Sequence, residues 1–187
     1  MRRKLEKLRK FPQKRYLITL VFVSFLATLG LMYIMSDINT KLKSTEGSFD
    51  IVDFEFAFTE DKAREILQSW KAELQEQAKR SIKIDFPFII VYSLFLSSLT
   101  LLLARTFKGT KRSIGIVLTL FPFLAGILDV LENVLLLSVL NSPNNINEIY
   151  VFIAGLAASV KFLLLSIVFL FLILGGGYRL AVGRRKR

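Results

Sequence analysis

The sequence predicts an all-α membrane protein: a four-transmembrane-helix bundle with a small extracytoplasmic β-hairpin-plus-helix cap. The chain has 187 residues, of which 53% are hydrophobic, and its mean hydropathy is +0.50. Such a composition is too apolar for an ordinary soluble fold. Four segments have the roughly 20 apolar residues that a helix needs to cross a ~30 Å hydrocarbon core. Basic residues gather beside these segments, which is typical of membrane topology signals.

The predicted organisation alternates spans with connecting segments. The four spans are residues 16–36, 87–105, 113–140 and 149–175. The segments outside the membrane are a basic N-terminus at 1–15, a cap at 37–85, a loop at 106–112, a short turn at 141–148 and a basic tail at 176–187.

Lysine and arginine set the predicted orientation. Residues 1–16 hold eight of them against Glu6 alone, and the loop at 106–112 and the tail are also basic. Residues 36–85 instead carry eleven acids and eight bases. Since cytoplasmic segments are enriched in Lys and Arg, we expect both termini in the cytoplasm, the cap outside, and the protein in the plasma (inner) membrane.

The same basic segments bear on the expected partners. Each one adjoins a span, so membrane topology explains it and nucleic acid is not expected as a partner. Cations beside a membrane attract anionic lipid headgroups, which we expect near the cytoplasmic segments. A protein partner or a homo-oligomer is the other class of partner that the sequence leaves open.

Two residue types are missing altogether, because the chain has no Cys and no His. Their absence excludes disulfides, thiol chemistry and any zinc, haem or triad site that depends on His. A catalytic site would have to use carboxylates, Ser, Thr, Tyr or Lys, and a metal ion would need oxygen ligands alone. We expect no cofactor and no metal site, and we assign no catalytic residue.

The cap is expected to begin with a β-hairpin. In residues 51–58, Val52 and three phenylalanines lie on one side of a period-two pattern and Asp53 and Glu55 on the other. A period of two with aromatics is typical of a half-buried strand. We predict strands at about 37–43 and 50–58, joined by a turn in residues 44–48. The aromatic residues on the apolar side of the second strand are Phe54, Phe56 and Phe58.

A helix at about residues 60–83 is expected to complete the cap. Thr59 suits its N-cap, and Glu60 and Asp61 suit the positive end of its dipole. Apolar residues then recur three and four apart, an amphipathic face that we expect to pack on the aromatic side of the hairpin. The residues of this face with a predicted packing role are Ile66, Leu67 and Trp70.

Ionisable side chains lie within the third and fourth spans, where they cost at least ~2.5–3.5 kcal/mol each and usually turn to the bundle interior. The predicted intramembrane polar cluster consists of Asp129, Glu132, Asn133 and Lys161. The first three are three and four residues apart and so share a helix face. Small residues on the same faces allow close helix contact; they are Ala125, Gly126, Ala154, Ala157 and Ala158.

The short turn at 141–148 makes the third and fourth spans antiparallel neighbours, which fixes their relative depth. We expect Lys161 to contact Asp129. Glu132 would lie one turn nearer the outer face, with Asn133 as a bridge. Two acids against one base also predict that one carboxyl keeps its proton.

The cluster is open to three interpretations. It sets helix pairing, it forms a polar pocket for protons, an ion or a lipid headgroup, or its two carboxylates carry out acid–base chemistry.

Two stretches resemble a group of known proteins. The first is Asp53-Phe-Glu55-Phe-Ala57-Phe-Thr59, continued by Ala63-Arg64-Glu65-Ile66-Leu67 and Trp70; the second is Leu128-Asp129-Val-Leu-Glu132-Asn133, followed by Val160-Lys161-Phe162. They are similar to small uncharacterised bacterial four-transmembrane proteins with an LDxxEN third span and a lysine in the fourth. The likeness covers most of residues 50–165 and implies no activity. The layout of spans and outer loops also looks like that of claudin-type tetraspans, an analogy of architecture.

These observations favour a non-enzymatic integral membrane protein organised around the acid–lysine cluster. We expect a partner subunit, an assembly factor or a binder of a lipidic ligand. The alternative is a small proton- or ion-coupled transporter or channel that uses Asp129, Glu132 and Lys161. A membrane enzyme that acts on lipid is the third interpretation.

Overall fold

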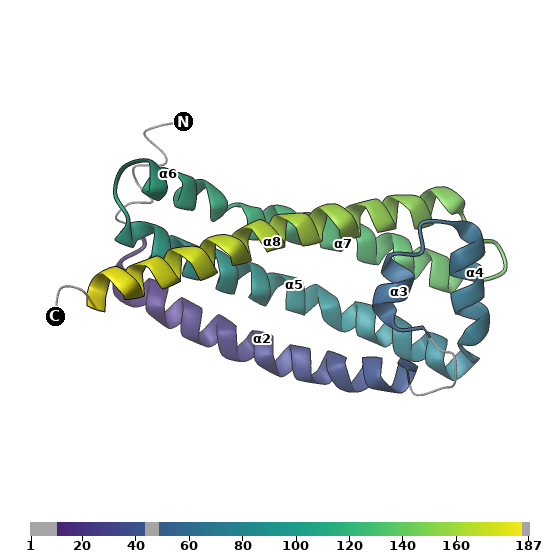
Figure 1. The fold of residues 1–187 in the computed structure, drawn as a ribbon. Coiled ribbons are helices and arrows are strands. Elements are labelled where there is room, and N and C mark those ends of the chain that lie inside the picture. The colour runs from purple at the N-terminus through teal and green to yellow at the C-terminus, as the bar shows by residue number, and fades with distance from the viewer. Residues whose placement is uncertain (1–10, 44–48, 185–187) are drawn as a thin grey trace.

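The computed structural model describes residues 11–43 and 49–184, and this part of the chain is helical apart from its connecting segments. Four long helices run along the molecule (Figure 1). They are α2 (Lys14–Lys43), α5 (Ala72–Thr106), α7 (Phe121–Asn141) and α8 (Glu148–Arg184). The shorter helices are α3 (Ile51–Glu55), α4 (Glu60–Ser69) and α6 (Gly109–Leu118).

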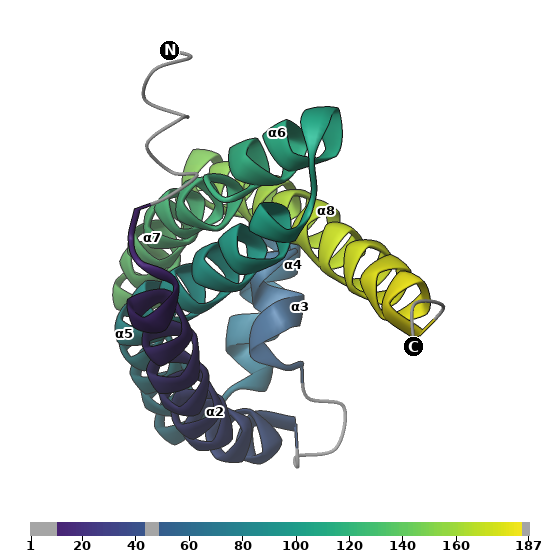
Figure 2. The same ribbon diagram turned by 90° about the vertical axis from the view of Figure 1, so that its left-hand side faces the viewer.

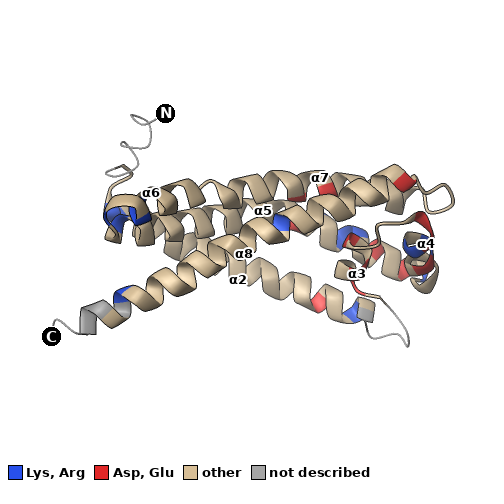
Figure 3. Cartoon of the chain, turned by 45° about the horizontal axis from the view of Figure 1, so that its top comes forward, with Lys and Arg blue, Asp and Glu red and all other residues tan. Residues whose placement is uncertain are grey.

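Four helical segments are long and apolar enough to cross a membrane, the architecture of an integral membrane protein. Three of them lie in α2, α5 and α8, and the fourth joins α6 to α7 over Gly109–Asn141. Helices α3 and α4 lie together at one end of the bundle and form the cap, whereas α6 lies at the opposite end (Figure 1). Basic side chains gather at the α6 end, and acidic side chains are concentrated in and near the cap (Figure 3).

The long helices form an open arc. Helix α2 packs against α5, α5 against α7, and α7 against α8, so α2 and α8 lie at the two ends of the arc (Figure 2). Helix α2 is accordingly the least buried span: 11% of its most apolar stretch is buried, compared with 44% in α5. Most side chains of α2 therefore face outward.

The predicted β-hairpin is wrong. Residues 37–43 continue α2, and residues 50–58 contain α3; the expected turn at 44–48 lies outside the described residues. The physical reason is a capping box. The Asp50 carboxylate accepts a hydrogen bond from Asp53 N at 3.0 Å, and Asp50 N donates to Asp53 Oδ2 at 2.8 Å. This reciprocal pair stabilises the start of a helix and overrides the period-two pattern.

The predicted cap helix at 60–83 is interrupted at Trp70, whose backbone is extended. Gln75 Nε2 donates to the carbonyls of Leu67 at 2.9 Å and Trp70 at 3.1 Å, which satisfies acceptors left open at the end of α4. The Trp70 indole Nε1 donates to Phe49 O at 2.9 Å. These side-chain hydrogen bonds stabilise a break that the amphipathic pattern did not indicate.

Several helices are longer than the transmembrane spans predicted from the sequence. Helix α5 passes through Pro87 without ending, so the predicted span 87–105 is only the second part of a longer helix. Helices α2 and α8 likewise extend beyond the predicted spans 16–36 and 149–175. A helix does not have to end where its apolar stretch ends, which is why boundaries drawn from hydropathy are too short here.

The third span, predicted as one helix at 113–140, is divided between α6 and α7 at Thr119, shortly before Pro122. Backbone carbonyls around such a break lack their helical partners. Hydroxyls of α5 donate to carbonyls at this break: Ser97 Oγ donates to Thr119 O at 2.7 Å, and Ser93 Oγ donates to Pro122 O at 3.0 Å. The neighbouring helix α5 is therefore hydrogen-bonded to the chain at the break.

The residues with a predicted packing role in the cap divide into two groups. Those buried in the core of the cap are Phe54, Ile66, Leu67 and Trp70. Phe56 and Phe58 instead face α8, where Phe56 stacks on Phe162 with 5.6 Å between ring centroids. Phe58 has a left-handed backbone (φ 57°) and covers Gly155, where an added Cβ would lie 2.8 Å from its ring. These two aromatic rings dock the cap onto α8.

Candidate functional site

Lys161 lies at the centre of the candidate site, on α8. Its Nζ is 2.8 Å from Asp129 Oδ1 and 2.7 Å from Glu132 Oε2, both on α7. The same Nζ is 3.6 Å from Glu55 Oε2 on α3, and the Lys161 side chain is only 5% exposed. The structure thus contains a buried lysine–carboxylate cluster inside the span region, with an additional acid from the cap.

Small residues let α7 and α8 approach closely enough for these contacts. The buried ones are Ala125 on α7 and Ala154, Ala157 and Ala158 on α8. Gly126 has a different neighbour, because an added Cβ there would lie 2.9 Å from Ser93 Oγ on α5. The predicted contact residues therefore serve two interfaces, α7 with α8 and α7 with α5.

Two further polar residues of α5 extend the cluster. Tyr92 OH donates to Asp129 Oδ2 at 2.9 Å. Asn133 Nδ2 donates to Asp85 Oδ2 at 2.7 Å. Asn133 therefore binds an acid on α5, and the predicted bridge between Asn133 and the Asp129–Lys161 pair is not formed.

Sequence reasoning did not single out Glu55, Asp85 or Tyr92 as site residues. Asp85 and Tyr92 are seven residues apart, which is two helical turns, so they share one face of α5. This spacing was a usable signal, but the predicted cap ended at Asp85 and the predicted span began at residue 87, so the two residues were assigned to different segments. A strand would point Glu55 away from the aromatic side, whereas α3 turns it toward Lys161.

The cluster holds more acceptors than donors. Glu132 is fully buried, and its Oε1 has no hydrogen-bond partner among the described residues. Its Oε2 is close to Lys161 but also lacks hydrogen-bond geometry, so this contact is an ion pair. Counting Asp85, four carboxyl groups gather near one ammonium. Burial raises the pKa of the Glu55 carboxyl, and the positive charge of Lys161 offsets this effect only in part.

A groove of about 370 Å³ opens beside the cluster. Its charged end is formed by Glu55, Asp85, Asp129 and Lys161, with the Tyr92 hydroxyl among them. The remaining walls come mainly from apolar side chains of α2, α5 and α8, among them Met32, Met35, Phe88, Phe95, Leu165 and Phe169. The groove therefore lies on the open side of the arc and combines a charged end with apolar walls.

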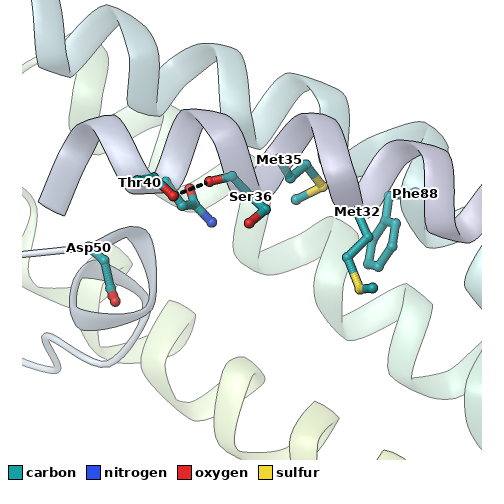
Figure 4. A pocket seen from close by; sticks show the side chains of 7 residues that line it. Met32, Met35, Ser36, Thr40, Asp50 and Phe88 are labelled. Atoms are coloured by element: carbon teal, nitrogen blue, oxygen red, sulfur yellow. Dashed lines mark hydrogen bonds between the residues drawn. The ribbon is translucent and has the colours of Figure 1, made fainter. Parts of the chain in front are cut away.

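A second hollow of about 390 Å³ adjoins the groove along α2. Met32, Met35, Asn39 and Phe88 line both spaces. Figure 4 shows the two methionines on α2 with Phe88 beside them, and Asp50 of the cap at the far end of the hollow. The two hollows therefore lie next to each other along α2.

The arrangement can hold a polar group at the cluster and an apolar chain along α2 and α8. Within residues 11–43 and 49–184, no group of three or more acidic side chains is placed to hold a metal ion. Fold and site together define a four-helix integral membrane protein whose internal lysine–carboxylate cluster opens into an apolar groove. No family model, curated protein or solved structure matches the chain.

Proposed function

We propose that this protein is a non-enzymatic binder of a lipid-like ligand, which lies in the groove between α2 and α8. The observation that carries the proposal is the combination of a charged end and long apolar walls in one space. An amphiphilic ligand needs both, because its head requires polar partners and its chain must be kept from water. The other non-enzymatic roles that the sequence suggests, a partner subunit and an assembly factor, require no such groove.

Depth supports a lipid as the ligand. The positive-inside rule places the basic end, with Arg105 and Arg179, in the cytoplasm. Asp85 precedes Arg105 by 20 residues of α5, or about 30 Å. Lys161 precedes Arg179 by 18 residues of α8, or about 27 Å. Since the hydrocarbon core is about 30 Å thick, α5 and α8 leave enough length between the charged end and the cytoplasmic boundary to shield a lipid chain.

The apolar walls run inward from that level. On α8, Phe169 follows Lys161 by eight residues, or about 12 Å. On α2, Thr28 precedes Asn39 by eleven residues, or about 16 Å. These lengths match roughly half of the hydrocarbon core, the depth of one leaflet. The proposed ligand is therefore a lipid of the plasma (inner) membrane, with its head at the cluster.

Co-purified lipid tests this proposal. The full chain is isolated in mild detergent, and bound lipid is measured by native mass spectrometry. Thr28 lines the apolar end of the groove, so Thr28→Trp should fill it and remove most of the bound lipid. The matched control is Leu29→Trp, at a neighbouring position that is 40% exposed and outside the groove. Equal lipid retention by the two variants would contradict binding in the groove.

A proton- or ion-coupled transporter is the second candidate function. It is favoured by Glu132, a fully buried carboxyl whose Oε1 lacks a partner among the described residues, because carboxyl groups inside membranes often relay protons. This candidate requires proton or sodium flux across liposomes that contain the wild-type chain. Flux no greater than in empty liposomes would rule it out and leave lipid binding as the proposal.

A further inference from the structure

We infer that the polar end of the ligand is a cation of the ammonium type, so that the preferred ligand is an amine-headed amphiphile. This inference rests on the lipid-binding function proposed above and adds the chemical class of the head. It follows from which hydrogen-bonding groups of the cluster are already engaged, from the balance of charge, and from the aromatic rings in the walls.

The only ammonium of the cluster is already engaged. Lys161 has three N–H donors and three surrounding carboxylates, of which Asp129 and Glu132 lie 2.8 and 2.7 Å from Nζ. Glu55 lies on the third side at 3.6 Å. An anionic head entering the groove would have to displace one of these carboxylates before it could bind Lys161. The cluster is therefore poorly suited to a phosphate or carboxylate head.

In contrast to the donors of Lys161, carboxylate oxygens that can accept hydrogen bonds remain available at the groove. Glu55 and Asp85 are half-buried and line it. Among the described residues, Asp85 accepts a hydrogen bond at Oδ2 only, from Asn133. Glu55 Oε2 is beyond hydrogen-bond distance of Lys161 Nζ. A ligand head that donates hydrogen bonds can use both carboxylates without breaking a hydrogen bond.

The balance of charge in the cluster points in the same direction. Glu132 is fully buried, and its Oε1 has no partner among the described residues. The four carboxyl groups of the cluster thus have one ammonium between them. A second ammonium at the groove side would bring the charges closer to balance, and buried charges require such pairing.

The walls next to the cluster suit a cation as well. Phe162 lies with its ring centroid 4.9 Å from Lys161 Nζ, so one aromatic face already carries a cation. The rings of Phe88 and Tyr92, 5.4 Å apart, also line the groove. Aromatic faces attract ammonium groups, including quaternary ones. They would hold the carbon atoms of the head while Glu55 and Asp85 accept its hydrogen bonds.

Binding of a cation should depend on pH. The charged and titratable groups around Glu55 of α3 are Asp85 and Tyr92 on α5, Asp129 and Glu132 on α7, and Lys161 on α8. Burial raises the pKa of Glu55, so a proton competes with the cation for this carboxylate at low pH. Amine binding should strengthen as the pH rises, whereas binding of a neutral amphiphile should not.

The test uses three probes with the same chain: hexadecylamine, hexadecanol and hexadecanoate. Each is titrated against the full chain in mild detergent, and binding is followed by native mass spectrometry. We expect hexadecylamine to bind at least about tenfold more tightly than hexadecanol, equivalent to about 1.4 kcal/mol, and hexadecanoate to bind most weakly. The double variant Glu55→Gln, Asp85→Asn should bring the amine-to-alcohol ratio close to one. The matched control Glu148→Gln, an exposed acid at the start of α8, should leave the ratio unchanged.

The possible outcomes separate this inference from the function on which it rests. If hexadecanol or hexadecanoate binds as tightly as the amine and Thr28→Trp blocks it, the groove binds amphiphiles and the cationic head is wrong. An amine preference that persists in the double variant also overturns the assignment to Glu55 and Asp85. If no probe binds the wild-type chain, the proposed function fails together with the inference.

Discussion

Lys161 has two sides, and they differ in access. On one side is the α7–α8 seam, where the side chains of Asp129 and Glu132 are 6% and 0% exposed. On the other side is the groove, where the Glu55 side chain is 16% exposed and Asp85 is half-buried. The same ammonium therefore belongs to a helix contact that is almost fully buried and to the wall of an open space, which Asp129 also lines.

This difference in exposure shows how one cluster can both hold two helices together and bind a ligand. Buried ion pairs are weak evidence for extra stability, but they can specify which helices pair and in which register. The seam has that geometry, and Ala154 and Ala158 on the same helix as Lys161 are also fully buried. The acids on the groove side are less buried, so they stay available to a ligand. Substitutions on the two sides should therefore have different consequences.

The largest effect is expected from Lys161→Met. Methionine keeps much of the side-chain volume but leaves the carboxyl groups of Asp129 and Glu132 without their cation. Removal of one partner from a buried ion pair destabilises a protein by about 3–5 kcal/mol. The loss should appear in the free energy of unfolding, measured in detergent micelles with SDS as denaturant.

Two comparisons make this prediction specific. Lys41→Met removes a lysine whose side chain is 59% exposed and pairs with Asp37, and such surface pairs contribute about 0–1 kcal/mol. Replacing Asp129, Glu132 and Lys161 together with Asn, Gln and Met should recover most of the stability, because no unpaired charge is left between α7 and α8. If the triple variant is as unstable as Lys161→Met, the seam does not act as a balanced ion pair.

An intermediate effect is expected from Tyr92→Phe, which tests the boundary between the two sides. Tyr92 lines the groove, but its hydroxyl donates to Asp129 Oδ2 of the seam. Loss of a hydrogen bond to a charged group costs about 1.5–3 kcal/mol. Tyr33→Phe is the matched control, because Tyr33 is 79% exposed. The same unfolding assay measures both, and equal stability of the two variants would mean that Tyr92 belongs to the groove alone.

The seam could be predicted from the sequence and the groove could not. Asp129, Glu132 and Lys161 stand out because ionisable residues are rare inside apolar stretches, and a short turn fixes the depth of α7 relative to α8. The groove depends on Glu55, and its position follows from α3, a helix of five residues that the alternating aromatics concealed. The Asp50–Asp53 spacing is the local signal that could have indicated a helix start.

The position of Asp85 was concealed for a different reason. A proline two residues later suggested the first turn of a new span, whereas α5 passes through Pro87 without a break. The open arc is also invisible in the sequence, because hydropathy places helices in the membrane without saying which of them touch. The order of contacts from α2 to α8 comes from packing across the whole bundle.

The smallest effect is expected from Glu55→Gln, and its signature is a change in pH dependence. Burial raises the pKa of Glu55 above its ordinary value of 4.5, so the docked cap binds more protons than a released cap. Docking is therefore most stable at low pH and weakens as the pH rises from 4.5 through the raised pKa. Glutamine cannot ionise, so the variant should show a flatter dependence.

Trp70 offers a direct readout for this last effect. It is the only tryptophan in the chain, and it is buried in the cap core, so its fluorescence reports release of the cap during denaturation. Glu65→Gln is the matched control, because Glu65 lies in the same cap with a side chain that is 57% exposed. A wild-type cap whose stability rises between pH 5 and pH 8, or a Glu55→Gln variant with the same slope as wild type, would show that Glu55 is not held in a buried, proton-binding position. The claim that the groove contains a titratable acid would then be wrong. The prediction for Lys161→Met would be unaffected, because it concerns only the contact between α7 and α8.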